Sequence, residues 1–226
     1  MNTLYAFGCS FTDWHYQRLA YDWWKKEHHF IHRLSVELGM KCVNAGQSGD
    51  ANESILRNFY KYQNQFKKGD VVLLQSTFGN RLVFHHHPTS EQVDLTGPIN
   101  QLPPTTQKDF RDRFSSHFIK TINEYLVLYN HPDFIIDDMY AAYPMISEWC
   151  KMKGIHIVFW ALDDYIPSEL VTKAPNGKGW CNWITENGLT INDDIGNDDD
   201  HLGFKGMDTM YEKFILIIRN VMLRNN

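Results

Sequence analysis

The stretch LYAFGCS, residues Leu4–Ser10, places a serine directly after a short apolar run. The apolar residues predict a first β-strand over residues 3–7, and the small residues after them predict a tight turn. Open α/β sheets bind their ligands at the carboxyl edge of the strands, which is where Ser10 would lie. A serine hydroxyl is a weak nucleophile alone, so Ser10 would need a base, a residue that orients the base, and donors for an oxyanion.

Strands and helices alternate along the rest of the chain. Apolar runs predict strands at residues 3–7, 41–44, 71–76 and 155–162. Helical spacing of apolar side chains predicts helices at residues 21–38, 52–66, 110–129, 135–153 and 207–223, with Asn52 as an N-cap and a break at Pro144. This alternation predicts βαβ units, and therefore a parallel sheet with helices on both faces.

The chain has the length of one domain, which we place at residues 1–226. It contains neither an internal repeat nor a linker that would divide it. Residues 82–106 hold four prolines and no clear period, so we expect a loop or lid insertion near the carboxyl edge. Residues 163–200 are rich in Gly, Asn and Asp and predict mostly loop.

Composition argues against several classes of protein. The net charge is −5 and the Lys and Arg residues are scattered, so no nucleic-acid footprint is expected. The four cysteines lack C-x-x-C spacing, which disfavours a disulfide framework and a cysteine zinc site. Three adjacent histidines, His85–His87, would point to alternating faces of a strand, so we expect a solvated loop and no metal. No cofactor is expected.

Two further features bear on location. The longest apolar run, Ile155–Leu162, is too short to span a bilayer. The first residues lack a basic segment ahead of an apolar core, so no signal peptide is expected. These features predict a cytoplasmic protein, although a phage or virion component would show the same pattern.

Four loops carry the residues of a candidate site: Gly8–Ser10, Asn44–Gly49, Phe78–Asn80 and Asp198–Gly203. In this order they resemble the four blocks of the SGNH (GDSL-like) hydrolase family, which includes esterases, lipases and carbohydrate esterases. The resemblance implies a three-layer α/β/α, flavodoxin-like sandwich with a parallel sheet of four to five strands. Two departures stand out, because Cys9 replaces the family's Asp and the third block shifts its Gly and lacks its Asp.

The resemblance assigns a catalytic triad. Ser10 would be the nucleophile and His201 the base, because an imidazole can accept the hydroxyl proton near neutral pH. Asp198 lies three residues before His201 and would orient the imidazole, although Asp199 can do so if the turn differs. Read alone, Ser10 would more often be a helix cap and His201 a surface histidine.

The resemblance also assigns an oxyanion hole. Its donors would be the backbone N–H of Ser10, the backbone N–H of Gly49 and the side-chain amide of Asn80. Gly49 suits this role because the missing side chain lets a substrate approach the backbone. Gly49 can also serve only a turn, and Asn80 can be only a turn former.

These residues predict a metal-independent serine ester hydrolase. The resemblance to the family implies an acetyl or other short acyl group as the part removed and a carbohydrate as the part that carries it. Two alternatives stay open: a non-catalytic glycan- or partner-binding module, and an O-acyltransferase using the same triad. A phosphate binder on the same fold is disfavoured, because the chain lacks G-x-G-x-x-G and the P-loop lysine. The expected partner is a small-molecule or glycan acyl ester, with no nucleic acid and no membrane span. The substrate and the oligomeric state stay open.

Overall fold

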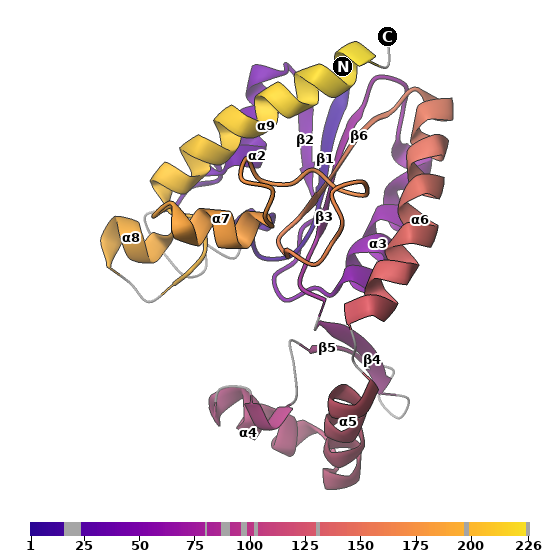
Figure 1. Cartoon of the computed structure of the whole chain (residues 1–226), viewed down its shortest axis with the longest axis vertical. Coiled ribbons are helices and arrows are strands. Elements are labelled where there is room, and N and C mark those ends of the chain that lie inside the picture. Colours follow the sequence, from indigo (N-terminus) through magenta and orange to yellow (C-terminus); the bar gives the residue numbers. More distant parts are fainter. Residues whose placement is uncertain are drawn as a thin grey trace.

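A computed structural model describes residues 1–15, 24–79, 81–86, 91–95, 99–101, 104–129, 132–196 and 199–224. Four parallel strands form its central sheet in the order β2-β1-β3-β6 (Figure 1). The strands are β1 (Thr3–Phe7), β2 (Lys41–Asn44), β3 (Val71–Ser76) and β6 (His156–Ala161). Each of the four predicted strands is confirmed to within a residue at either end.

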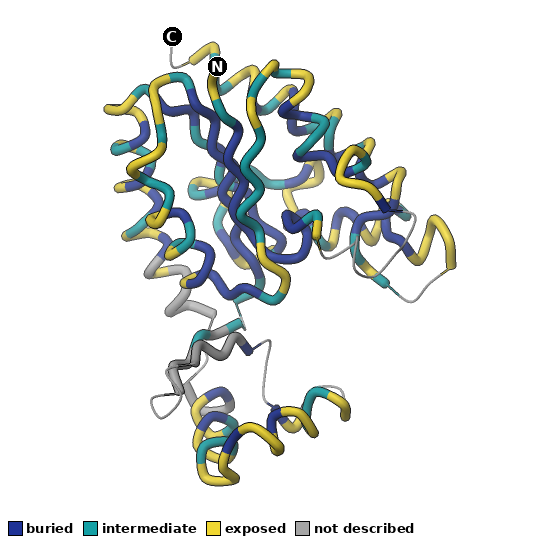
Figure 2. Tube along the Cα trace, turned by 180° about the vertical axis from the view of Figure 1, so that it is seen from behind, coloured by how far each residue is buried: buried dark blue, intermediate teal, exposed yellow. Residues whose placement is uncertain are grey.

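Strand β3 lies at the centre of the molecule. It has a neighbouring strand on each side, and all six of its residues are buried. Figure 2 shows the same burial along the middle of the sheet, with exposed residues confined to the outer parts of the molecule. A strand covered on both faces reads as a continuous apolar run, which is why its position could be predicted from the sequence.

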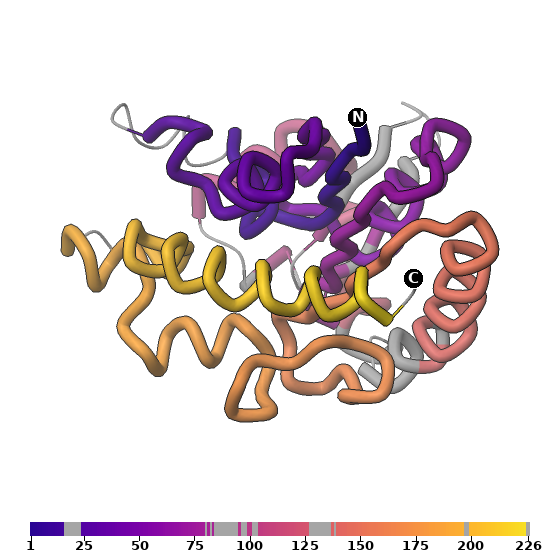
Figure 3. Tube along the Cα trace, turned by 90° about the horizontal axis from the view of Figure 1, so that it is seen from above, coloured from indigo at the N-terminus to yellow at the C-terminus, as the bar shows by residue number. Residues whose placement is uncertain are grey.

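Helices cover both faces of the sheet. One face packs against α2 (Phe30–Glu37), α7 (Trp180–Glu186) and α9 (Phe204–Arg224), and the other against α3 (Asn52–Tyr62) and α6 (Pro132–Lys153) (Figures 1 and 3). Alternate residues of β1 divide between the two layers, since Leu4 packs with the first group and Tyr5 with the second. The predicted three-layer α/β/α sandwich with a parallel sheet is therefore confirmed.

One predicted helix start and one predicted N-cap are wrong. The helix expected at residues 21–38 is α2, which begins only at Phe30 after a short 3₁₀ turn over Lys26–His28; residues 21–23 lie outside the described residues. Helix α2 begins late because the His29 ring caps it, its Nδ1 accepting the Ile31 N–H at 3.2 Å. Helix α3 has Ala51 at its N-cap, because the Asn52 side chain is bonded to another loop.

The described residues of the segment after β3 form strands and helices and not only a loop. It contains β4 (Leu82–His86) and β5 (Glu91–Leu95), which pair antiparallel, a 3₁₀ turn at Ile99–Gln101, α4 (Pro104–Arg113) and α5 (Ser116–Tyr129). We call residues 82–129 the insertion. It lies beyond the carboxyl edge of the sheet (Figure 1). It has a core of its own, formed by Leu95, Ile99, Phe110, Phe114, Ile122 and Leu126.

The remaining helices correct two further predictions. The helix expected at residues 110–129 is two helices, and α4 begins at Pro104 because proline suits a first helical turn. Helix α6 runs through Pro144. Buried Tyr143 before the proline and buried Ile146 after it both pack against the sheet and hold the helix in place. Residues 163–200 contain two short helices, α7 and α8 (Ile191–Ile195), and the described remainder is mostly loop, as expected. Buried Trp180 anchors α7 in the core.

Candidate active site

Ser10, His201 and Asp199 form a hydrogen-bonded chain of three side chains. His201 Nε2 lies 2.7 Å from Ser10 Oγ, and His201 Nδ1 lies 2.7 Å from Asp199 Oδ1. Asp199 Oδ1 also accepts the backbone N–H of His201 at 2.9 Å. An imidazole that donates from Nδ1 to Asp199 presents the lone pair of Nε2 to the Ser10 hydroxyl. The arrangement is therefore suited to removing the hydroxyl proton.

The carboxylate at His201 belongs to Asp199, the alternative that the sequence left open. Asp198 lies outside the described residues, and so does the neighbouring Asn197. An aspartate two residues before the histidine can accept its backbone N–H in a local turn, as Asp199 does. One carboxylate oxygen thus holds both the ring and the backbone of His201.

Burial controls the protonation of His201. Its side chain is 21% exposed, and its ring packs on Phe11 with 5.0 Å between ring centroids. Burial is the largest single influence on the pKa of His201 and lowers it below its ordinary value, against the opposing effects of Asp199 and Asp200. The positive charge of Arg81 lowers the same pKa further. His201 is therefore neutral at pH 7 and available as a base.

A tight turn positions Ser10 at the end of β1. The Cys9 carbonyl accepts the backbone N–H groups of Thr12 and Asp13, both at 2.9 Å, so one helical turn begins at Ser10. Ser10 itself is 3% exposed. Within the part of the chain that the structure describes, the Ser10 N–H donates to no protein acceptor. It is free to serve a ligand.

Gln75, from the end of β3, holds this turn in place. Its Oε1 accepts the Cys9 N–H at 3.2 Å and the Thr12 hydroxyl, while its Nε2 donates to Cys9 Sγ at 3.1 Å. A Cβ at Gly8 would lie 2.1 Å from Gln75 Oε1, so position 8 requires glycine. Gln75 was not among the residues predicted from the sequence. A polar side chain in an otherwise apolar buried strand was the signal that could have identified it.

Cys9 has a structural explanation. It is fully buried in the core beneath α2 and α9, and its thiol is the acceptor for Gln75 Nε2. Its Sγ lies 4.0 Å from Ser10 Oγ, while His201 Nε2 contacts the serine at 2.7 Å. The base therefore serves Ser10, and Cys9 fixes the turn together with Gln75.

The loop after β2 packs directly on the Ser10 turn. Gln47 N–H donates to the Gly8 carbonyl at 2.9 Å, and Ser48 N–H donates to Asp13 Oδ2 at 3.1 Å. Gly49 follows with φ = 86°, a backbone conformation that favours glycine. Among the described residues, the Gly49 N–H has no acceptor. Two unpaired backbone donors thus lie on loops that contact each other.

The loop after β3 is tied to the second loop. Thr77 N–H donates to Asn52 Oδ1 at 2.8 Å, and Gly79 N–H donates to Asp163 Oδ2 at 3.2 Å. Asn80, the third expected oxyanion donor, lies outside the described residues. The next residue, Arg81, donates from Nη1 to the Asp50 carbonyl at 3.3 Å. The loops after β1, β2 and β3 therefore form one connected assembly at the carboxyl edge.

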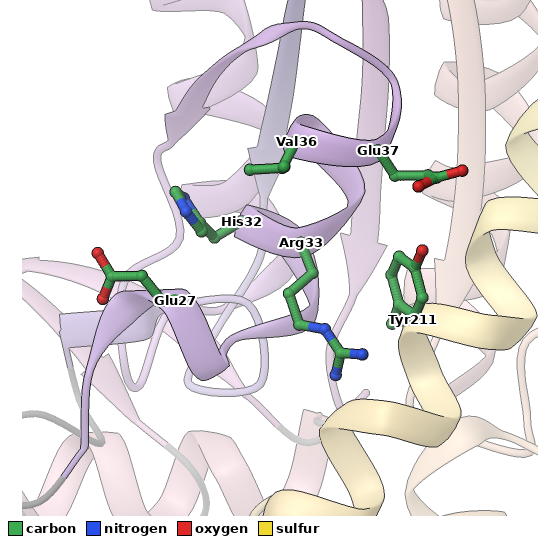
Figure 4. Close-up of a pocket in the computed structure, with 6 residues that line it drawn as sticks. All are labelled: Glu27, His32, Arg33, Val36, Glu37 and Tyr211. Atoms are coloured by element: carbon green, nitrogen blue, oxygen red, sulfur yellow. The ribbon is translucent and has the colours of Figure 1, made fainter.

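A separate cavity lies between α2 and α9 (Figure 4). It has a volume of about 340 Å³ and is lined by Glu27, His32, Arg33, Val36, Glu37 and Tyr211. Its central cation is already engaged, since Arg33 stacks over the Tyr211 ring at 4.4 Å and pairs with Asp208. None of these residues belongs to the loops that carry Ser10 and His201, so this cavity is not the candidate active site.

Three other expectations concern a metal site, the run of histidines and a membrane span. In those ranges, no group of three or more His, Cys, Asp or Glu side chains is arranged to hold a metal ion. His85 and His86 belong to β4 and not to a loop, and His87 lies outside the described residues. No described helix combines the length and apolar character needed to cross a membrane.

Comparison with known proteins gives distant structural likenesses, among them one to a solved bacterial structure. No family model matches the chain, and no curated protein matches it. The fold is similar to a solved structure from Desulfitobacterium hafniense DCB-2, described as a "putative lipolytic protein of G-D-S-L family". The two share 13% identity with a TM-score of 0.39, over 96% of this chain and 99% of the other. A likeness this distant assigns no activity to this chain.

Proposed function

We propose that this protein is a serine ester hydrolase of the SGNH kind, with Ser10, His201 and Asp199 as its triad. The observation that carries the proposal is the continuous hydrogen-bonded chain from Ser10 Oγ through the imidazole to Asp199. The nucleophile comes from one end of the sequence, and the base and its orienting carboxylate come from the other. Chance local packing is therefore a poor explanation for their alignment. The same chain favours catalysis over a binding-only module, which has no need of an activated serine.

The chemistry follows from these positions. His201 Nε2 takes the Ser10 proton while Oγ attacks the ester carbonyl carbon, and Asp199 stabilises the imidazolium that forms. The developing oxyanion accepts hydrogen bonds from the N–H groups of Ser10 and Gly49, with the Asn80 amide as a third donor. Collapse expels the alcohol, which takes the proton from His201. Water, deprotonated by His201, then attacks the acyl-Ser10 ester; collapse releases the carboxylic acid, and the leaving Ser10 Oγ takes the proton back from His201.

The finer assignment concerns the substrate. We propose an acetyl or other short acyl ester, with a carbohydrate as a suitable alcohol part. This follows from the resemblance of the four loop motifs to a family that includes carbohydrate esterases. An O-acyltransferase would use the same acyl-Ser10 intermediate, so products formed with a sugar acceptor present would separate transfer from hydrolysis.

The Ser10→Ala variant tests the mechanism. We expect it to lose hydrolysis of p-nitrophenyl acetate by about 10³-fold or more, because the nucleophile of the triad is gone. Labelling by a fluorophosphonate probe should vanish with it. The matched control is Ser168→Ala, since Ser168 is exposed. Hydrolysis and labelling unchanged in a folded Ser10→Ala variant would overturn the proposal.

A further inference from the structure

Arg81 is a half-buried cation at the candidate site that has no counter-ion in the described part of the chain. Arg33, Arg113 and Arg219 each pair with a carboxylate. Arg81 uses one N–H donor on the Asp50 carbonyl and lies over the Phe78 ring, 5.3 Å from its centroid. A guanidinium has five N–H donors, so the remaining four are available to a ligand.

The position of Arg81 connects it to the catalytic groups. Its contact with Asp50 places it against the loop that carries Gly49, and its ring partner Phe78 lies on the loop that precedes Asn80. Its charge also acts on His201, whose pKa it lowers, and on Cys181. The guanidinium therefore lies at the edge of the Ser10–His201 pair and not on a remote surface.

Two nearby carboxylates are directed to other partners, and a further one, Asp200, forms no ion pair with Arg81 although its charge also acts on His201 and Cys181. Asp199 accepts from the His201 ring and backbone. Asp163 accepts the N–H groups of Gly79 and Tyr165, at 3.2 and 3.1 Å. Neither forms an ion pair with Arg81. An unpaired cation next to a nucleophile attracts an anionic group, and a guanidinium fork matches the two oxygens of a carboxylate or phosphate.

We propose that Arg81 is a specificity-determining residue that binds an anionic group, a carboxylate or a phosphate, on the alcohol part of the ester substrate. This inference rests on the proposed esterase function and narrows its substrate class. The Phe78 ring and the Asp50 carbonyl hold the guanidinium in place before the substrate arrives, which reduces the entropy lost on binding. A neutral ester would leave this cation without a partner.

The test compares matched substrates and matched variants. The substrates are 4-acetoxybenzoate, 4-acetoxyphenyl phosphate and the neutral 4-acetoxybenzamide, which share the acetyl ester and differ in charge. Arg81→Gln removes the cation but keeps an amide that can donate to the Asp50 carbonyl, and Arg81→Lys restores a point charge. Arg33→Gln removes the same charge from the separate cavity between α2 and α9 (Figure 4) and serves as the control.

For the wild type we expect kcat/KM to be at least about tenfold higher for one of the anionic esters than for the benzamide. Arg81→Gln should lower that anionic value by about 10–100-fold and leave the neutral value within about threefold, as expected for a lost charged hydrogen bond. Arg81→Lys should recover part of the loss, and Arg33→Gln should change neither value. Which anion is preferred distinguishes a carboxylate substrate from a phosphate substrate.

Three outcomes overturn the inference in distinguishable ways. If the wild type hydrolyses all three esters equally and folded Arg81→Gln does the same, the anion site is refuted while the esterase function stands. If the wild type hydrolyses none of them and a fluorophosphonate does not label Ser10, the esterase function fails and the inference fails with it. An equal loss on neutral and anionic esters in Arg81→Gln, with Arg81→Lys no better, would make Arg81 a structural residue only.

Discussion

Replacing Asp199 with asparagine tests the carboxylate that the structure places on His201. The substitution keeps the shape of the side chain but removes its charge. An asparagine that turns its amide N–H toward Nδ1 favours the imidazole tautomer that carries its proton on Nε2. That nitrogen lies 2.7 Å from Ser10 Oγ, and once protonated it can no longer accept the serine proton.

The magnitude follows from what Asp199 supplies. Its Oδ1 makes two hydrogen bonds to His201, at 2.7 and 2.9 Å, and its charge opposes the lowering of the His201 pKa by burial. A hydrogen bond to a charged group is worth about 1.5–3 kcal/mol, and the wrong tautomer adds to its loss. We expect kcat/KM to fall by about 10²–10⁴-fold, which corresponds to about 3–5 kcal/mol of barrier.

The assay is hydrolysis of p-nitrophenyl acetate across pH, with thermal unfolding of each variant as the folding control. Asp198→Asn is the matched control, since it removes the same charge one residue away and should change kcat/KM by no more than about threefold. Combining Asp199→Asn with Ser10→Ala should cost little beyond Ser10→Ala alone, because residues of one triad act as a unit. A larger loss in Asp198→Asn than in Asp199→Asn would refute the assignment.

Three further predictions concern the support of the site. Gly8→Ala should destabilise the fold by about 1–3 kcal/mol in urea unfolding, because its Cβ would meet Gln75 Oε1; wild-type stability would contradict this. The pH profile of kcat/KM should have its acid limb below about 6.5, since the pKa of His201 is lowered; a midpoint above pH 7 would be inconsistent. Burial lowers the pKa of His29 to about 3, so the unfolded chain binds a proton that the folded chain does not between pH 6.5 and 3. Stability is full above pH 6.5 and declines as pH falls, so the advantage of wild type over His29→Asn should shrink by about 1.4 kcal/mol per pH unit from pH 6 to 4, and a constant difference would refute it.

The sheet and its order along the chain could be predicted because burial on both faces leaves a direct signature in the sequence. Strand β3 begins with the apolar run Val71–Leu74, and β6 is apolar from Ile157 to Ala161. Helix boundaries were harder to predict from the sequence, because tertiary contacts decide them. His29 caps α2 late, and the Asn52 side chain is taken by Thr77 instead of its own helix.

In the candidate site, too, some residues could be predicted from the sequence and others depend on tertiary contacts. Ser10 and His201 could be chosen from their residue types and places in the sequence, and the structure brings them together at 2.7 Å. The sequence could not decide between adjacent aspartates, since the choice depends on a turn of two residues. Gln75 and Arg81 were missed because their roles arise from contacts with loops distant in sequence, with Cys9 for one and Asp50 for the other.

The insertion has a consequence for the free energy of folding. It lies within the connection between β3 and β6, which covers residues 77–155. The entropy lost on closing a chain segment grows only with the logarithm of its length, so each doubling costs about 0.6 kcal/mol. A crossover made four times longer therefore costs about 1.2 kcal/mol, and the insertion's own apolar core offsets part of that cost. The segment beyond the carboxyl edge can thus be lengthened or replaced at a small cost in entropy while β1 and β3, which position Ser10 and Gln75, stay as they are.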